Sequence, residues 1–253
     1  MSTRRRYNPE GEIINYKRRI RRNRRRRRAF FFFVSTAIIL TVIFRAPFFA
    51  INRIDITGTN VTTVAVREFA NTLMGKNINW YSMSNIAETI EGIPYVRTAR
   101  VTRHFPDFVR IHIEERIPFT QMEIDGTFFL IDRDGRVLEA SREAFDGVIE
   151  LIAVSEVAGD YFTDVGSIIF NNYIAIARAI TDHDLFEEIQ WVDLSDILNM
   201  RFQMGNILVR IGTAERLDYK FNRLIDIRAE IPSHIRGTLD IPEGRGNFRE
   251  EFH

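Results

Sequence analysis

The stretch Val96-Arg-Thr-Ala-Arg-Val-Thr-Arg-His-Phe-Pro-Asp-Phe-Val-Arg-Ile-His-Ile-Glu-Glu-Arg-Ile-Pro118 predicts two strands joined by a tight turn. In the second strand, apolar residues fill every other position from Val109 to Ile113, so one face is buried and the other meets water. In the first strand, residues 96, 98, 100 and 102 point to one face and residues 97, 99, 101 and 103 to the other. Phe105-Pro-Asp107 supplies the turn, because proline presets φ and aspartate bonds its own backbone.

The residues before this pair of strands predict one more strand and two helices. Ile54 and Ile56 alternate with polar residues, and Gly58-Thr-Asn60 then turns the chain. Thr62 or Thr63 caps the first helix. The inward-facing residues are Val66, Phe69, Ala70 and Leu73 in the first helix, and Ile86, Ala87 and Ile90 in the second, Asn85–Glu91. The predicted order is β-α-α-β-β, which suits a small domain.

Further upstream, five arginines, Arg24–Arg28, meet an uncharged apolar run from Ala29 to Phe44. This run predicts one transmembrane helix, roughly residues 29–50. Residues 1–28 hold twelve arginines and one lysine against two glutamates, a net charge of +11, and the rest of the chain carries a net charge of −10. Basic flanks stay in the cytoplasm, so the N-terminus is predicted inside and everything after the span outside. The tail 1–28 is too polar to fold alone and is expected to be disordered.

Two other interpretations of this junction carry less weight. A cleaved signal peptide, of general or twin-arginine type, fits poorly because the apolar core is long and Phe48 stands where a small residue is expected. Nucleic-acid binding by the arginines is the second. A basic run beside a span more often sets topology and contacts anionic lipid, so we expect Arg24–Arg28 to touch membrane lipid and no nucleic acid to bind.

Downstream of Pro118 the pattern predicts a β-rich domain with two helices. Asp132-Arg-Asp-Gly135 is a hairpin turn signal and lacks the remaining ligands of an EF-hand calcium loop. Gly205-Asn206 is a candidate two-residue hairpin. The last strand, Thr238–Ile241, ends at Pro242 and is expected near a sheet edge, where another chain could add a strand; closing its own sheet is the simpler interpretation. Residues 243–253 are expected to fray.

The stretch Val96–Pro118, followed by Leu130-Ile-Asp-Arg-Asp-Gly-Arg-Val137, resembles the bacterial cell-division family FtsQ/DivIB. The resemblance runs from the span to about residue 242 and rests on the series R-x-F-P-D, E-x-R-x-P and L-I-D-x-x-G-x-V. It implies that 51–117 form a POTRA domain and 118–242 the β domain of that family. The fold class is thus α+β: a single transmembrane helix, a β-α-α-β-β POTRA domain, and a β-rich domain with two flanking helices.

The resemblance also implies partners, namely the small bitopic division proteins FtsB and FtsL. In this family they are held by the C-terminal strand and the helix before it. By position, the partner-binding residues are Thr238, Leu239, Asp240 and Ile241 in the strand, with Tyr219, Arg223 and Asp226 on the outer part of the helix.

Catalysis has no support in the sequence. There is no cysteine, and the five histidines are dispersed without an H-E-x-x-H motif. Glu114 and Glu115 are neighbours on a strand and therefore point to opposite faces, so they cannot share a site; we expect Arg116 or Arg103 to pair with one of them. No catalytic residue, cofactor or metal is predicted.

Two functional classes follow. The preferred one is a non-enzymatic scaffold of the division septum, spanning the inner membrane once, with its N-terminus in the cytoplasm and its domains in the periplasm. Several modest contacts confined to a membrane would add up to useful avidity. The alternative is an envelope transport or outer-membrane assembly factor, because POTRA domains also serve those machines. The region after the POTRA unit is too short for a translocator barrel, which favours the scaffold.

Overall fold

The structure is a computed structural model that describes residues 26–39, 41, 47–232, 234–241 and 246–250. Most of the predicted tail and part of the predicted span, residues 40 and 42–46, lie outside the described residues, as does Pro242. Contacts between residues divide the chain into two compact units. The first contains the described residues up to Ile56 with Arg67–Ile86 and Val101–Ile111; the second contains Thr57–Val66, Ala87–Arg100 and everything from His112 onward.

The predicted span is only partly described. Residues 26–39 are helical, and the side chains of Phe30 to Phe33 are 65 to 72% exposed. Within the described ranges, no helix combines the length and the apolar character that crossing a bilayer requires. The C-terminal end of the predicted span differs from the prediction. Pro47–Phe49 form a 3-10 turn, η1, and Ala50 pairs with Asn77, so these residues already belong to the folded first unit.

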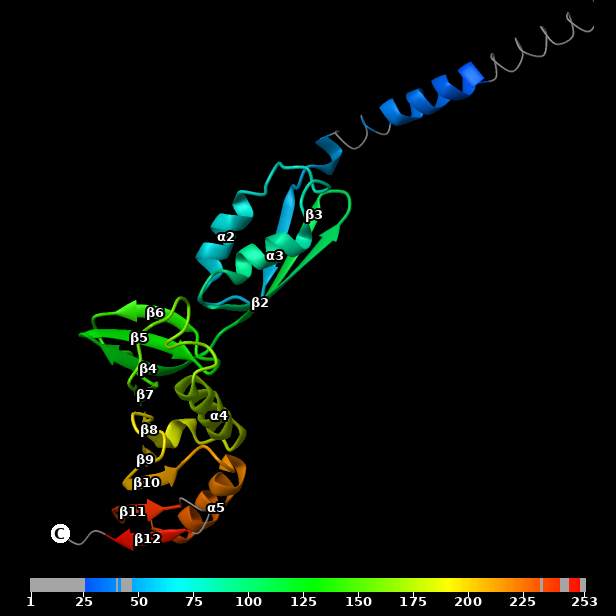
Figure 1. The fold of residues 1–253 in the computed structure, drawn as a ribbon. Coiled ribbons are helices and arrows are strands. Elements are labelled where there is room, and N and C mark those ends of the chain that lie inside the picture. Colours follow the sequence, from blue (N-terminus) through cyan, green and yellow to red (C-terminus); the bar gives the residue numbers. More distant parts are fainter. Residues whose placement is uncertain (1–25, 40, 42–46, 233, 242–245, 251–253) are drawn as a thin grey trace, which may run out of the picture. The chain divides into compact units, whose positions relative to one another are not determined.

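The β-α-α-β-β prediction is confirmed. The elements are β1 (Arg53–Thr57), α2 (Thr63–Asn71), α3 (Met83–Glu91), β2 (Val96–His104) and β3 (Phe108–Glu115), and the sheet order is β1-β3-β2. Figure 1 shows both helices beside this sheet. The apolar alternation in β3 explains the arrangement, because its inward residues Val109, Ile111 and Ile113 are almost fully buried while the residues between them are exposed.

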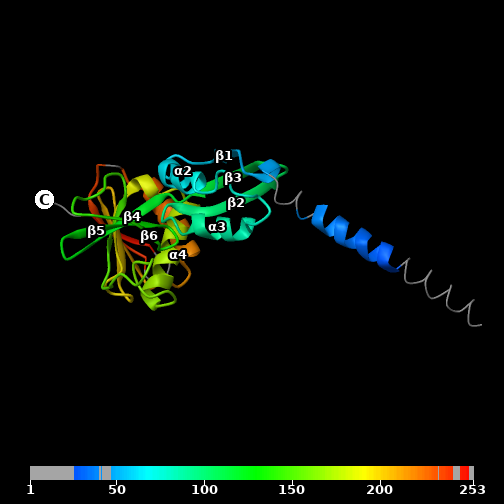
Figure 2. The same cartoon turned by 90° about the horizontal axis from the view of Figure 1, so that it is seen from above.

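A nine-stranded sheet forms most of the rest of the chain. Its order is β12-β11-β10-β9-β8-β7-β4-β5-β6. Figure 1 and Figure 2 show helix α4 beside this sheet. The elements are β4 (Pro118–Ile124), β5 (Thr127–Asp132), β6 (Val137–Ser141), β7 (Ile149–Ile152), α4 (Ile168–Asp182), η2 (Phe186–Glu188), β8 (Ile189–Asp193), β9 (Met200–Met204), β10 (Ile207–Gly212), α5 (Leu217–Glu230), β11 (Gly237–Asp240) and β12 (Asn247–Glu250).

The two helices and the large sheet share one hydrophobic core. Fully buried members include Phe162 before α4, Ile180 in α4, Phe202 in β9 and Phe221 in α5. The rings of Phe202 and Phe221 stack with their centroids 5.7 Å apart, which joins α5 to the middle of the sheet. The predicted hairpin at Gly205-Asn206 is confirmed, since it connects β9 to β10 and Gly205 has φ of 56°.

The C-terminus differs from the prediction. β11 pairs in parallel with β10 on one side and antiparallel with β12 on the other, so it is an inner strand. Residues 247–250, which were expected to fray, form β12 and occupy the edge of the sheet. Gly237 permits this pairing, because a Cβ there would meet the backbone oxygen of Arg249 and the ring of Phe248.

Candidate functional site

Arg116, in the link between β3 and β4, is the centre of a buried charged cluster. Its Nη1 donates to Asp132 Oδ2 at 2.6 Å and lies 3.4 Å from Asp134 Oδ2. The two paired side chains are 12% and 4% exposed. Arg116 makes two further hydrogen bonds to backbone carbonyl oxygens. Its backbone N–H donates to the Tyr95 carbonyl oxygen at 2.7 Å, and its Nε donates to the Val96 carbonyl oxygen at 3.3 Å. The arginine thus joins the start of β2 to the end of β5, and the residues that it contacts all belong to the second unit.

Asp132 also stabilises the turn after β5. Its Oδ1 accepts the backbone N–H groups of Asp134 at 3.0 Å and Arg136 at 2.8 Å. Gly135 follows with φ of 82°, a conformation that favours glycine. The hairpin prediction for Asp132–Gly135 is therefore confirmed. Across the part of the chain that the structure describes, no group of three or more metal-ligating side chains is present.

Tyr173 links helix α4 to the same cluster. Its hydroxyl donates to the Asp132 carbonyl oxygen at 2.7 Å and lies 2.9 Å from Thr120 Oγ1. Tyr173 is fully buried, and burial raises the pKa of its phenol far above the usual value, with the Asp132 charge acting in the same direction. The hydroxyl therefore stays protonated and serves as a fixed donor.

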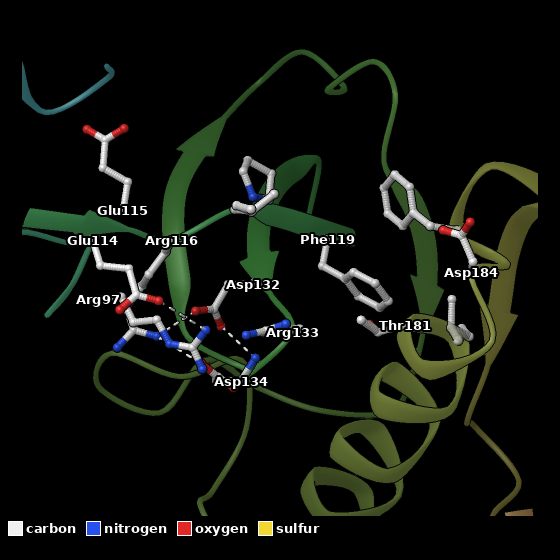
Figure 3. A pocket seen from close by; sticks show the side chains of 14 residues that line it. Arg97, Glu114, Glu115, Arg116, Phe119, Asp132, Arg133, Asp134, Thr181 and Asp184 are labelled. Atoms are coloured by element: carbon white, nitrogen blue, oxygen red, sulfur yellow. Dashed lines mark hydrogen bonds and ion pairs between the residues drawn. The ribbon is translucent and has the colours of Figure 1, made fainter. Parts of the chain in front are cut away.

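A hollow of about 370 Å³ opens beside this cluster, and Figure 3 shows the side chains around it. One wall is charged: Arg97 reaches Asp134 at 3.2 Å and lies 4.0 Å from Glu114. The other wall is apolar and includes the rings of Phe119 and Phe186, whose centroids are 5.3 Å apart. The charged groups of the hollow are engaged with one another. Such an arrangement can hold elements in place, and it offers no paired nucleophile and base among the described lining residues.

Glu115 lines the hollow, but its carboxylate binds the backbone just before helix α2. Its carboxylate accepts the backbone N–H groups of Asn60, Val61 and Thr62 at 2.9, 3.2 and 2.7 Å, and the Thr62 hydroxyl at 2.6 Å. Burial acts to raise the pKa of Glu115, but these hydrogen bonds outweigh it and hold the pKa below its usual range. The prediction that Glu114 and Glu115 do not share a site is confirmed.

The arginine partners were predicted wrongly. Arg116 pairs with Asp132 and not with either glutamate, and Arg97 is the arginine nearest Glu114. Arg103 donates to the Tyr81 carbonyl oxygen at 2.6 Å. One feature of the sequence pointed to the Arg116–Asp132 pair: Arg116 is the arginine of the E-x-R-x-P motif, and Asp132 is the first aspartate of the L-I-D-x-x-G-x-V motif.

The predicted partner-binding residues lie at the C-terminal end of the large sheet. Leu239 and Ile241 are fully buried and Thr238 is 9% exposed, so these side chains pack within the chain. Asp240 carries two ion pairs, to Arg210 at 3.7 Å and Arg249 at 3.4 Å. The structure therefore places the four strand residues one strand in from the edge.

The predicted helix residues lie on the outer part of α5, where Tyr219 is half-exposed and Arg223 and Asp226 are exposed. Arg216 lies over the Tyr219 ring, 4.7 Å from its centroid. The sequence analysis missed β12. This strand contains a single apolar residue, Phe248, so it shows no alternating pattern that would predict a strand. Partner binding by the residues of β11 and α5 stays a prediction.

Comparison with known proteins gives the following matches. Residues 49–116 match the family model "POTRA domain, FtsQ-type". The chain is 25% identical over 220 residues to "Cell division protein DivIB" of Clostridium botulinum (strain Hall), covering 81% of this chain and 83% of that protein. It is 26% identical over 211 residues to DivIB of Clostridium tetani, covering 81% and 78%. "Cell division protein FtsQ" of Syntrophotalea carbinolica is 27% identical over 99 residues, 39% of this chain and 35% of that protein.

One solved structure is also similar. It is the major extracytoplasmic domain of the trans isomer of the bacterial cell-division protein DivIB from Geobacillus stearothermophilus, at 12% identity and a TM-score of 0.33, covering 49% of this chain and 99% of that chain.

Proposed function

We propose that the chain, whose residues 49–116 match the FtsQ-type POTRA model and which is similar to DivIB and FtsQ cell-division proteins, is a non-enzymatic scaffold of the division septum. The matches to division proteins over four-fifths of the chain carry this proposal. The buried cluster around Arg116 agrees with it, because its charges hold strands and a helix together instead of facing a substrate. On this proposal the protein acts through binding surfaces and not through a catalytic centre.

The proposal places the chain in the inner membrane, crossed once, with the N-terminus in the cytoplasm. The charge of +11 before the span and the exposed aromatic side chains of Phe30–Phe33 support this topology. Arg24–Arg28 would rest against anionic lipid on the cytoplasmic side. The POTRA domain, proposed as 51–117, and the β domain, proposed as 118–242, would then lie outside the cytoplasm.

Partners are proposed to bind at the C-terminal end of the large sheet. β12 ends the strand order, so among the strands that the structure describes only β11 lies beside it. An extended segment of a partner could add a strand there through backbone hydrogen bonds. Thr238 to Ile241 would act by holding β12 in place, and Tyr219, Arg223 and Asp226 would contact the partner from α5. The proposed partners are FtsB- and FtsL-like bitopic proteins.

The test is co-purification of the full chain from its own cells in mild detergent. Arg249→Pro on β12 removes a backbone donor and disturbs the edge, whereas Ser141→Pro on β6 makes the same change at the opposite edge of the sheet. We expect small division proteins to co-purify with the wild type and with Ser141→Pro, and to be lost with Arg249→Pro.

The other outcomes separate the parts of the proposal. If Arg249→Pro still co-purifies with the same division proteins, the scaffold function stands but the edge of β12 is not the binding site. Recovery of secretion or outer-membrane assembly factors in place of division proteins would overturn the scaffold.

A further inference from the structure

Large aromatic side chains are exposed at one end of the first unit. Phe48 is 66% exposed, Trp80 69% and Phe105 60%, whereas the neighbouring Ile51 and Ile78 are fully buried. The three come from separate segments, namely η1, the connection between α2 and α3, and the turn between β2 and β3. Folding has thus brought three aromatic residues to a surface where burial in the chain's own core does not explain them.

Short contacts join these segments into one surface. The Phe49 carbonyl oxygen accepts the Ile78 N–H at 2.9 Å, and the Trp80 N–H donates to the Asn77 oxygen at 3.1 Å. The rings of Phe49 and Phe105 meet edge to face with centroids 6.2 Å apart. Figure 1 shows η1 and the β2–β3 turn at the same end of the small sheet. We call Phe48, Phe49, Trp80 and Phe105 the aromatic rim.

Two basic side chains accompany the rim. Lys76 Nζ lies 5.6 Å from the centre of the Tyr81 ring, and the Arg103 guanidinium lies 5.6 Å from the centre of the Phe105 ring. The ion pairs among the described residues include neither of them, and Arg103 donates to the Tyr81 carbonyl oxygen. Aromatic rings with cations beside them are typical of side chains at a membrane–water interface, where the acyl chains are apolar and the headgroups above them are anionic.

The position of the rim along the chain identifies the occupant. The rim follows the apolar run of the predicted span directly in the sequence, because Pro47–Phe49 already form η1 and Ile51 is completely buried in the first unit. The rim includes Phe48 and Phe49, the last aromatic residues of that apolar segment. In the sequence only three residues stand between Phe44, the end of the uncharged apolar run, and Phe48, so the headgroup layer is the environment that we expect these side chains to meet first.

We infer that the aromatic rim, with Lys76 and Arg103, docks on the outer headgroup layer of an anionic phospholipid bilayer and holds the POTRA domain against the membrane. The inference rests on the membrane anchoring given under the proposed function. Trp, Tyr and Phe side chains partition into the headgroup layer, and lysine and arginine near the surface are attracted by anionic lipid. Docking would limit the directions in which the POTRA domain can point from its anchor.

The test uses the full chain in lipid nanodiscs made of phosphatidylglycerol and phosphatidylcholine. The chain has two tryptophans, Trp80 and Trp191, which provides a matched pair of probes. Trp191→Phe leaves the rim tryptophan alone, and Trp80→Phe leaves the one in β8 as the control. Spin-labelled lipids, with the label at the headgroup or along the acyl chain, quench a tryptophan according to its depth.

We expect headgroup-labelled lipid to quench Trp80 emission strongly and to leave Trp191 emission unchanged. Phe105→Asp and Lys76→Glu should each reduce the quenching of Trp80, with circular dichroism and nanodisc insertion unchanged.

Three results would overturn the inference. If the chain inserts into nanodiscs and Trp80 is not quenched, the docking is wrong and the anchoring stands. If Trp80 becomes shielded only when another division protein is added, the rim is a protein contact. If the chain does not insert at all, both the docking and the anchoring fall.

Discussion

Replacing Arg116 by methionine should destabilise the second unit by about 3–5 kcal/mol, the range for removing one partner of a buried ion pair. The substitution keeps an apolar stem of similar length and removes the 2.6 Å bond to Asp132, a carboxylate only 4% exposed. A hydrogen bond to a charged group contributes about 1.5–3 kcal/mol, and the rest of the loss comes from leaving the carboxylate buried without its cation.

Urea unfolding of the full chain in detergent, followed by Trp191 emission, measures this loss, because Trp191 lies in the same unit as the pair. The matched control is Arg178→Met, since the Arg178–Asp182 pair on α4 is 79% and 55% exposed. That change should cost less than about 0.5 kcal/mol, as expected for a surface pair one helical turn apart. Equal effects of the two substitutions would refute the claim that the Arg116 cluster is a main stabiliser.

Three further predictions follow from the same contacts. Glu115→Gln should remove part of the pH dependence of the free energy of unfolding. The folded pKa of Glu115 is depressed, so the stabilisation by its carboxylate is present above the unfolded pKa of about 4.3 and is lost as the pH falls through the folded pKa. Wild type and variant should therefore differ near neutral pH and converge in acid unfolding curves. Tyr173→Phe should cost about 1–3 kcal/mol in urea unfolding, because the Asp132 oxygen and Thr120 lose a buried partner, and an unchanged midpoint would contradict that contact. Gly237→Ala should detach β12 and speed hydrogen exchange of its amides, since a Cβ has no room beside Phe248, and unchanged exchange would disprove the close approach.

Local patterns in the sequence predicted the strands of the small sheet and two hairpins of the large sheet. Alternation along β3 and the proline-aspartate turn at Phe105–Asp107 depend only on residues within a few positions of one another. The same holds for the hairpins at Asp132–Gly135 and Gly205-Asn206, where turn chemistry fixes the connection. These elements were predictable because the residues that specify each of them are adjacent in the chain.

Pairings between distant residues were not predictable in the same way. Arg116 is 16 residues from Asp132, and periodicity does not say which of several carboxylates an arginine meets. β12 has one half-buried apolar side chain, Phe248, and its pairing depends on the absence of a side chain at Gly237. At residues 47–51 an apolar run could enter lipid or a protein core, and hydrophobicity alone does not distinguish the two environments.

The central claim is that the chain holds division partners at the edge of β12 that faces away from β11. A photo-crosslinking amino acid placed at Arg249 in the full chain, in its own cells, tests it most directly, with the same amino acid at Ser141 on the opposite edge as the control. The account predicts a crosslink from position 249 to a small bitopic division protein and none from position 141. No crosslink to a division protein from position 249, or equal crosslinks from both positions, would contradict it.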